Sequence, residues 1–281
     1  MGEGRFGVLA AAPLALVLAL GFAAPLAIVM AFSAMPERVF DLGHRPDFSA
    51  YAAMIEQGYW RSLLRSLGMA LIATVILMLL CWPLAFAMAK LWKTFTLVIT
   101  IAVVLSLFVS ENIRLFGWVL VLMKGGLLDG YLQHWFGWGT GGLVYNPGAI
   151  VFGLIYVYFP FMLFPMAQGA AMIPEDARQA AFDLGASRWT VLREIDLPLA
   201  APGIMVGSLL CFVLSAGAIA EGKLLGGRSV ITIGDDVEAA FTYAQNWPLG
   251  SALAVSLIAV LGGLVVIALG RIDLDRIMGR R

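Results

Sequence analysis

Long stretches without charged residues alternate with short polar segments along the chain, and they define the predicted elements. Most of them exceed the roughly 20 apolar residues that a helix needs to cross a hydrocarbon core about 30 Å thick. Because backbone groups find no water in hydrocarbon, we expect helices; barrel strands of about ten alternating residues do not fit such long runs. Residues 1–281 are therefore predicted to form a single all-α transmembrane domain with about six spans, at residues 8–34, 63–89, 95–122, 149–172, 201–221 and 249–270.

The ends of the chain and its basic residues suggest an orientation. A secretory signal peptide has an apolar core of about 7–15 residues, and the first apolar stretch is much longer, so we favour a retained span. Basic residues prefer the cytoplasmic side. The Lys90/Lys93 turn and the basic tail at residues 271–281 favour placing both termini inside, as an even number of spans requires.

Composition excludes several classes of protein. Of the 281 residues, 61% are hydrophobic and 13% charged, whereas a soluble domain has about 25% charged residues. The 18 basic and 18 acidic residues cancel, so the basic excess of a nucleic-acid-binding protein is missing. The two cysteines, Cys81 and Cys211, fall within spans, and two histidines without a His/Cys cluster make a metal site improbable. No hydrolase, zinc-protease or Walker A motif is present, so we expect neither catalysis nor ATP binding by this chain.

The segment between the fourth and fifth spans, residues 173–202, predicts two short helices. Pro174 suits the first position of a helix, and Glu175 and Asp176 complement the positive end of its dipole. Gly185 can adopt the left-handed conformation that ends a helix, and Ser187 is a suitable N-cap for a second helix. Such a projecting segment is either a solvated loop or an element that enters a groove on another protein.

The residues of this segment resemble a known motif. The pattern is similar to the EAA loop of permease subunits of type I ABC importers. It consists of Gln179-Ala180-Ala181, then Gly185, then Ile195-x-Leu197-Pro198. In that family the loop docks on the ATP-hydrolysing subunit and transmits its closure to the membrane helices. The resemblance therefore implies that residues of this chain contact the ATPase, namely Gln179, Ala180, Ala181, Asp183, Leu184, Gly185, Ala186 and Ser187. Gln179 stands where the family usually has Glu, which removes one possible ion pair.

Two further stretches resemble the spermidine/putrescine branch of this family, which also handles opines and related solutes. They are residues 224–227 (Leu-Leu-Gly-Gly) with Phe241 and residues 246–252, and residues 113–118 (Ile-Arg-Leu-Phe-Gly-Trp) in the third span. The sequence departs from the branch at residues 220–223, because the branch commonly has a Thr-Pro pair at the positions of Glu221 and Gly222.

Charges inside predicted spans are candidates for the translocation path. Glu111 and Arg114 are three residues apart and share a helix face, and an isolated charge at mid-bilayer costs at least about 2.5–3.5 kcal/mol. They form either a structural ion pair or part of the path. Glu221 and Lys223 suit either a gate or an interfacial pair. The candidate path residues are Glu111, Asn112, Arg114, Tyr156 and Glu221.

The sequence thus predicts a permease subunit in the bacterial inner membrane. The resemblance implies an ABC ATPase dimer, a second permease and a periplasmic solute-binding protein as partners, with ATP and Mg held by the ATPase and no cofactor in this chain. The expected solute is a polyamine or a related amine or opine-like compound. The alternative is an ion-coupled secondary transporter with Glu111 as the proton or ion site. That alternative predicts inverted repeats or broken helices at matched positions.

Overall fold

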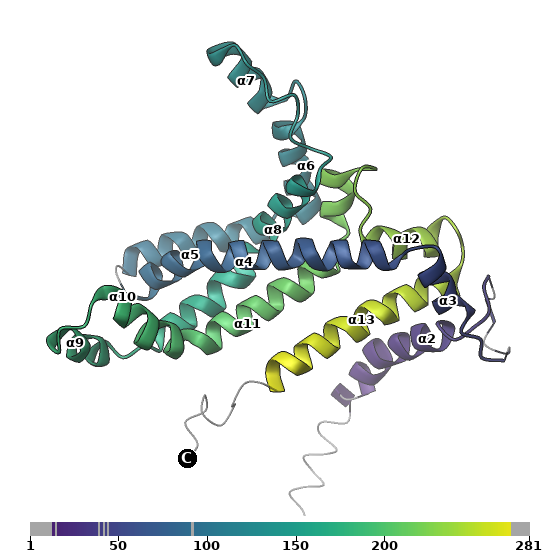
Figure 1. Ribbon diagram of the computed structural model, residues 1–281, viewed down its shortest axis with the longest axis horizontal. Helices are drawn as coiled ribbons and strands as arrows, with labels where there is room; N and C mark the ends of the chain where they lie inside the picture. Colours follow the sequence, from purple (N-terminus) through teal and green to yellow (C-terminus); the bar gives the residue numbers. More distant parts are fainter. Residues whose placement is uncertain are drawn as a thin grey trace, which may run out of the picture. The chain divides into compact units, whose positions relative to one another are not determined.

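The computed structural model describes residues 13–14, 16–38, 40–41, 43, 45–90 and 93–270. The described part is helical, and Figure 1 shows its elements. The elements are η1 (Ala19–Ala23), α2 (Ala24–Phe32), α3 (Ser49–Glu56), α4 (Trp60–Lys90), α5 (Lys93–Leu107), α6 (Glu111–Leu122), α7 (Leu127–Phe136), α8 (Pro147–Ala171), α9 (Glu175–Asp183), α10 (Arg188–Val191), η2 (Leu192–Asp196), α11 (Leu197–Ala216), η3 (Gly222–Gly226), α12 (Ile233–Thr242) and α13 (Trp247–Gly270); η marks π-helical turns.

The helices agree with the predicted class of fold. Five helical stretches among the described residues are long and apolar enough to cross a membrane: Trp60–Lys90, Glu111–Phe136, Pro147–Ala171, Arg188–Ala216 and Trp247–Ala268. Two shorter apolar helices occupy Leu16–Phe32 and Lys93–Leu107. Together with the helix at Leu16–Phe32, the five long stretches give each predicted span a helical counterpart. The start of the first predicted span and the basic tail lie outside the described residues.

The third predicted span, residues 95–122, is not one continuous helix as we expected. It is divided into α5 and α6 by a short break, and Ser110 in the break has an extended backbone (φ −52°, ψ 138°). Glu111 lies in the first turn of α6, where a carboxylate faces the positive end of the helix dipole. The charge that interrupts the apolar run therefore marks the start of a new helix.

The fifth predicted span, residues 201–221, also ends earlier than expected. Its helix α11 ends at Ala216, and the chain leaves the helical path at Gly217 before the turn η3 begins at Gly222. Glu221 consequently lies beyond the break rather than at the end of a continuous span. Proline inside α11, at Pro202, does not interrupt it.

Contacts divide the chain into two compact units, described here separately: residues up to Leu63 with Asp235–Leu264, and Leu64–Gly234 with the residues from Val265. In the first unit the Trp247 ring packs edge-on against Phe32 and Phe40, at centroid distances of 5.8 and 5.7 Å. In the second unit α4, α8 and α11 run side by side with α5 (Figure 1). Its core contains large, fully buried side chains from several helices, such as Leu77 on α4 and Met162 on α8.

The two helices α8 and α11 approach each other closely at paired glycines. A Cβ atom on Gly203 of α11 would overlap the backbone oxygen of Pro165 and lie 2.8 Å from the Gly169 Cα atom of α8. Small residues that let backbones meet are typical of helix packing in membranes. This contact joins the two helices that flank the segment 173–202.

We expect Gly203→Ala to lower the thermal unfolding temperature of the detergent-solubilised protein by several degrees. The added methyl group meets backbone atoms that cannot move aside, and overpacking costs about 1–3 kcal/mol. Gly68→Ala on α4 is the matched control, because a Cβ at Gly68 meets nothing within 4 Å. The control should keep or slightly raise the unfolding temperature. Equal unfolding temperatures for Gly203→Ala and the wild type would contradict this packing.

Candidate functional site

The segment between α8 and α11 folds as the predicted pair of short helices. Pro174 is the N-cap of α9, one position before the first helical residue where we placed it, because its extended backbone (φ −68°, ψ 129°) precedes the helix. Gly185 is left-handed (φ 85°), and the Ser187 hydroxyl accepts a hydrogen bond of 3.2 Å from the Thr190 amide. The second helix continues without interruption through η2 into α11, so this segment and a membrane helix share one helical stretch.

The tip of this segment presents apolar side chains to its surroundings. Leu184 is 90% exposed and Trp189 is 69% exposed, whereas Val191 on the other side is buried. Among the predicted coupling residues, Gln179, Ala180, Asp183, Gly185 and Ser187 are also exposed, and Ala181 and Ala186 are half-buried. Exposed tryptophan and other apolar side chains on a projecting segment are typical of a surface that another protein covers.

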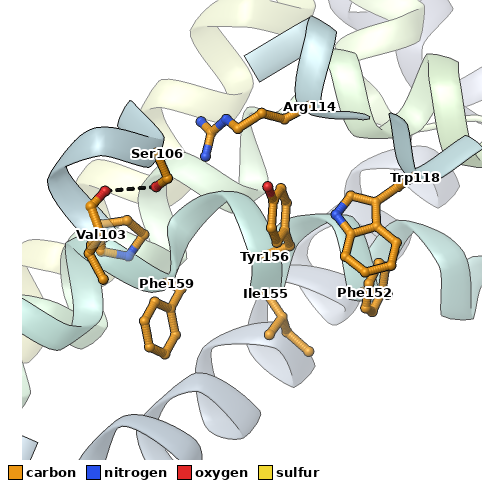
Figure 2. Close-up of a pocket in the computed structure, with 9 residues that line it drawn as sticks. Val103, Ser106, Arg114, Trp118, Phe152, Ile155, Tyr156 and Phe159 are labelled. Carbon is orange, nitrogen blue, oxygen red and sulfur yellow. Dashed lines mark hydrogen bonds between the residues drawn. The ribbon is translucent and has the colours of Figure 1, made fainter. Parts of the chain in front are cut away.

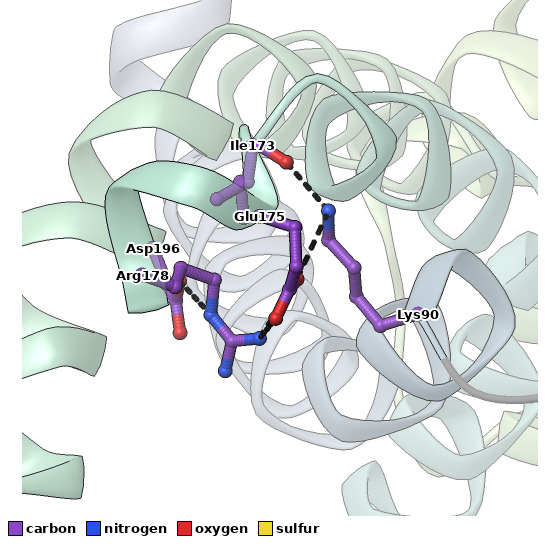
Figure 3. Close-up of polar contacts among 5 residues, drawn as sticks. All are labelled: Lys90, Ile173, Glu175, Arg178 and Asp196. Atoms are coloured by element: carbon purple, nitrogen blue, oxygen red, sulfur yellow. Dashed lines mark hydrogen bonds and ion pairs between the residues drawn. The ribbon is translucent and has the colours of Figure 1, made fainter. Parts of the chain in front are cut away.

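An ion-pair network holds the base of this segment against the membrane helices (Figure 3). We call it the Arg178 network, formed by Lys90, Glu175, Arg178 and Asp196. Arg178 lies 3.2 Å from the Glu175 carboxylate, and its Nε atom lies 3.0 Å from Oδ1 of the buried Asp196. Lys90 at the end of α4 donates to the backbone oxygen of Ile173 and lies 3.9 Å from Glu175.

Aromatic contacts complete the Arg178 network. The Arg178 guanidinium carbon lies 4.9 Å from the ring centroid of Phe86 on α4 and 6.0 Å from that of Phe182 on α9. One arginine therefore contacts α4, α9 and η2. This network was not predicted from the sequence. The i,i+3 spacing of Glu175 and Arg178 is a signal for their pair, but the contacts to Phe86 and Asp196 depend on the tertiary fold.

Gly185 offers a test of the local backbone. Under the coupling role that the resemblance implies for this segment, we expect Gly185→Val to lower ATP-driven uptake severalfold, because a β-branched residue is strained at φ 85°. Gly185→Asn should retain most of the uptake, since asparagine tolerates the left-handed region. No heavy atom lies within 4 Å of a Cβ at this position, so the two variants differ mainly in backbone strain. Equal uptake by both variants would show that the left-handed turn is dispensable.

A pocket of about 280 Å³ lies between α5, α6 and α8 (Figure 2). Its walls are mostly apolar and aromatic, and Arg114 is the charged residue in its lining. The Arg114 guanidinium carbon lies 5.6 Å from the ring centroid of Tyr156, and the Trp118 ring packs edge-on against both Tyr156 and Phe152. Two of the predicted path residues, Arg114 and Tyr156, therefore meet in one place.

Glu111 and Arg114 share a helix but do not pair in this structure. No ion pair among the described residues joins them, and the Arg114 Nε atom is buried without a hydrogen-bond partner. Both side chains are half-buried, while Asn112 between them is exposed. The structure thus supports a cation–π contact for Arg114 rather than the structural pair that the sequence left open.

Glu221 is separate from this pocket and completely buried. Neither of its carboxylate oxygens has a hydrogen bond of normal geometry, and its electrostatic neighbours include Tyr158 and Glu111. Lys223, two residues further along the chain, is exposed.

Comparison with known proteins identifies the family. Residues 83–277 match the model of the family described as binding-protein-dependent transport system inner membrane component. The chain belongs to this family. It is 31% identical over 219 residues to the spermidine/putrescine transport system permease protein PotB of Salmonella typhimurium, covering 77% of this chain and 76% of that protein. PotB of Escherichia coli K12 is 30% identical over 219 residues, covering 77% and 79%.

A solved structure supports the fold independently. A chain from the crystal structure of a bacterial ABC transporter involved in the import of the acidic polysaccharide alginate aligns with a TM-score of 0.65 and 16% identity, over 94% of both chains. The family member described here is thus a multi-pass inner-membrane permease subunit of an ABC importer, of the polyamine branch, with the fold of such a subunit.

Proposed function

We propose that this permease forms, together with a second permease subunit, the membrane path for a polyamine or a related amine. The observation that carries the proposal is the 30–31% identity, over about three quarters of the chain, to permeases of spermidine/putrescine transport systems. Two carboxylates in the membrane region, Glu111 and Glu221, and the aromatic rings of Tyr156 and Tyr158 suit a cationic solute.

The chain itself performs no chemical step in this proposal. A periplasmic binding protein delivers the solute, and partner ATPase subunits bind ATP and Mg and supply the energy. The exposed tip around Leu184 and Trp189 docks on an ATPase subunit. The continuous helix from Arg188 to Ala216 then carries the movement of the tip into the membrane. Glu111, Asn112, Arg114, Tyr156 and Glu221 are proposed to line or control the path.

Uptake by cells tests the proposed solute class. Cells that carry the complete transporter should accumulate labelled spermidine, and deletion of this chain should abolish that transporter-dependent uptake. Excess unlabelled putrescine should compete, because it presents the same ammonium groups, whereas an acidic solute such as glutamate should not. Uptake that is independent of this chain, or competition by glutamate but not by putrescine, would contradict the proposal.

A further inference from the structure

Glu221 lies at a break in a membrane helix. The helix α11 ends at Ala216, the chain passes Gly217 outside helical geometry, and the π-helical turn η3 begins at Gly222. Discontinuous helices at membrane depth expose polar groups that bind solutes or ions. Ser215, just before the break, has a buried hydroxyl that also lacks a hydrogen-bond partner. Unpartnered oxygen atoms therefore lie on both sides of this break.

Among the described residues, the electrostatic neighbours of Glu221 are a phenol and a second carboxylate. The turn η3 packs against α8 and α6, which contribute Tyr158 and Glu111, the electrostatic neighbours of Glu221. Gly153 on α8 leaves room for this packing, because a Cβ there would lie 2.5 Å from the Leu225 Cδ1 atom and 3.3 Å from the Glu221 Cγ atom. Both carboxylate oxygens of Glu221 are buried without a hydrogen-bond partner of normal geometry.

A second subunit cannot supply the missing counter-charge in this conformation. Glu221 is 0% exposed, so a side chain from outside this chain has no access to its carboxylate. A buried carboxylate without a partner is unfavourable in a membrane protein. It requires either a proton or a small cation that enters between the helices when the break opens. A protonated primary amine offers three N–H donors and one positive charge.

We propose that the Glu221 carboxylate, with the Tyr158 hydroxyl and the Glu111 carboxylate, binds one ammonium group of the solute during transport. This inference rests on the proposed function, because it assigns the solute's amine to a site in the permease. Two carboxylates and a phenol provide an acceptor for each of the three N–H groups. The Glu221 side chain is inaccessible from outside the chain in this conformation. The break at Gly217 gives the backbone a hinge point at which η3 can move away from α8.

The test uses the complete transporter with its binding protein and ATPase in proteoliposomes, with labelled putrescine as the probe. We expect Glu221→Gln, which keeps the shape and removes the charge, to reduce uptake at least tenfold while ATP hydrolysis and assembly are kept. The matched control is Lys223→Gln, a charge removal two residues away on an exposed side chain, which should transport putrescine as the wild type does.

The outcomes separate this inference from the proposed function. If the wild type transports no amine, the proposed function fails. If the wild type transports putrescine and Glu221→Gln transports it equally well, the ammonium site is wrong and the proposed function stands. Should Glu221→Gln fail to assemble, Tyr158→Phe decides: a KM for putrescine raised at least threefold supports the site, and an unchanged KM overturns it.

Discussion

Leu184→Asp is expected to abolish ATP-driven uptake by the assembled transporter, with the largest effect of any single change in the segment 173–202. Leu184 is 90% exposed at the end of the tip, and Trp189 on the same segment is 69% exposed, so the tip offers an apolar surface that another protein can cover. Full burial of a leucine side chain by the ATPase would contribute about 1.5–3 kcal/mol. A carboxylate would in addition lose its hydration when the ATPase docks.

Two measurements follow the effect of Leu184→Asp. Copurification of the ATPase subunits with this chain should be lost or strongly weakened, and uptake should fall with it. Leu184→Met, which keeps an apolar side chain of similar volume, is the matched control and should retain both properties. Normal copurification and uptake with Leu184→Asp would show that the tip does not dock on the ATPase.

Arg178→Met is expected to separate ATP hydrolysis from transport. Arg178 contacts Glu175 on α9, Asp196 on η2 and the Phe86 ring on α4. Its removal leaves the buried Asp196 without its closest cation, and breaking a buried pair in this way costs about 3–5 kcal/mol. The tip would remain able to dock, because Leu184 and Trp189 are unchanged, but its movement would no longer reach α4 and α11 together.

The measurement for Arg178→Met is uptake and ATP hydrolysis in the same proteoliposomes. Hydrolysis should persist while uptake falls at least tenfold. Arg188→Met is the matched control, because Arg188 is an exposed arginine of the same segment, and it should change neither quantity much. The double variant Arg178→Met/Asp196→Asn should be more stable than Arg178→Met alone, since it removes the uncompensated charge. A parallel loss of hydrolysis and uptake would contradict a role in transmission.

The features that were predictable from the sequence are local ones. A long apolar run requires a helix in hydrocarbon, so the positions of α4, α8 and α13 followed from charge spacing alone. Gly185 and Ser187 were predictable because the left-handed turn and the N-cap depend on residues next to them in the chain. The break before Glu111 was missed because an apolar run on each side of a charge does not show whether the helix continues.

The features that were not predictable depend on distant parts of the chain. The pairing of Arg178 with Asp196 and Phe86 joins three elements, and periodicity within one helix carries no information about it. Glu221 was noted as a charge near the end of a span, but its complete burial follows from the packing of η3 on α8 and α6. The one local signal in the sequence was that Glu221 stands where the spermidine/putrescine branch usually has threonine.

Energy coupling is the central claim, and uptake into proteoliposomes that contain the purified complex and its binding protein tests it most directly. Labelled spermidine should accumulate when ATP and Mg are supplied to the ATPase side, and not when an imposed proton gradient is the only energy source. Accumulation driven by the proton gradient without ATP would contradict the account and favour an ion-coupled transporter.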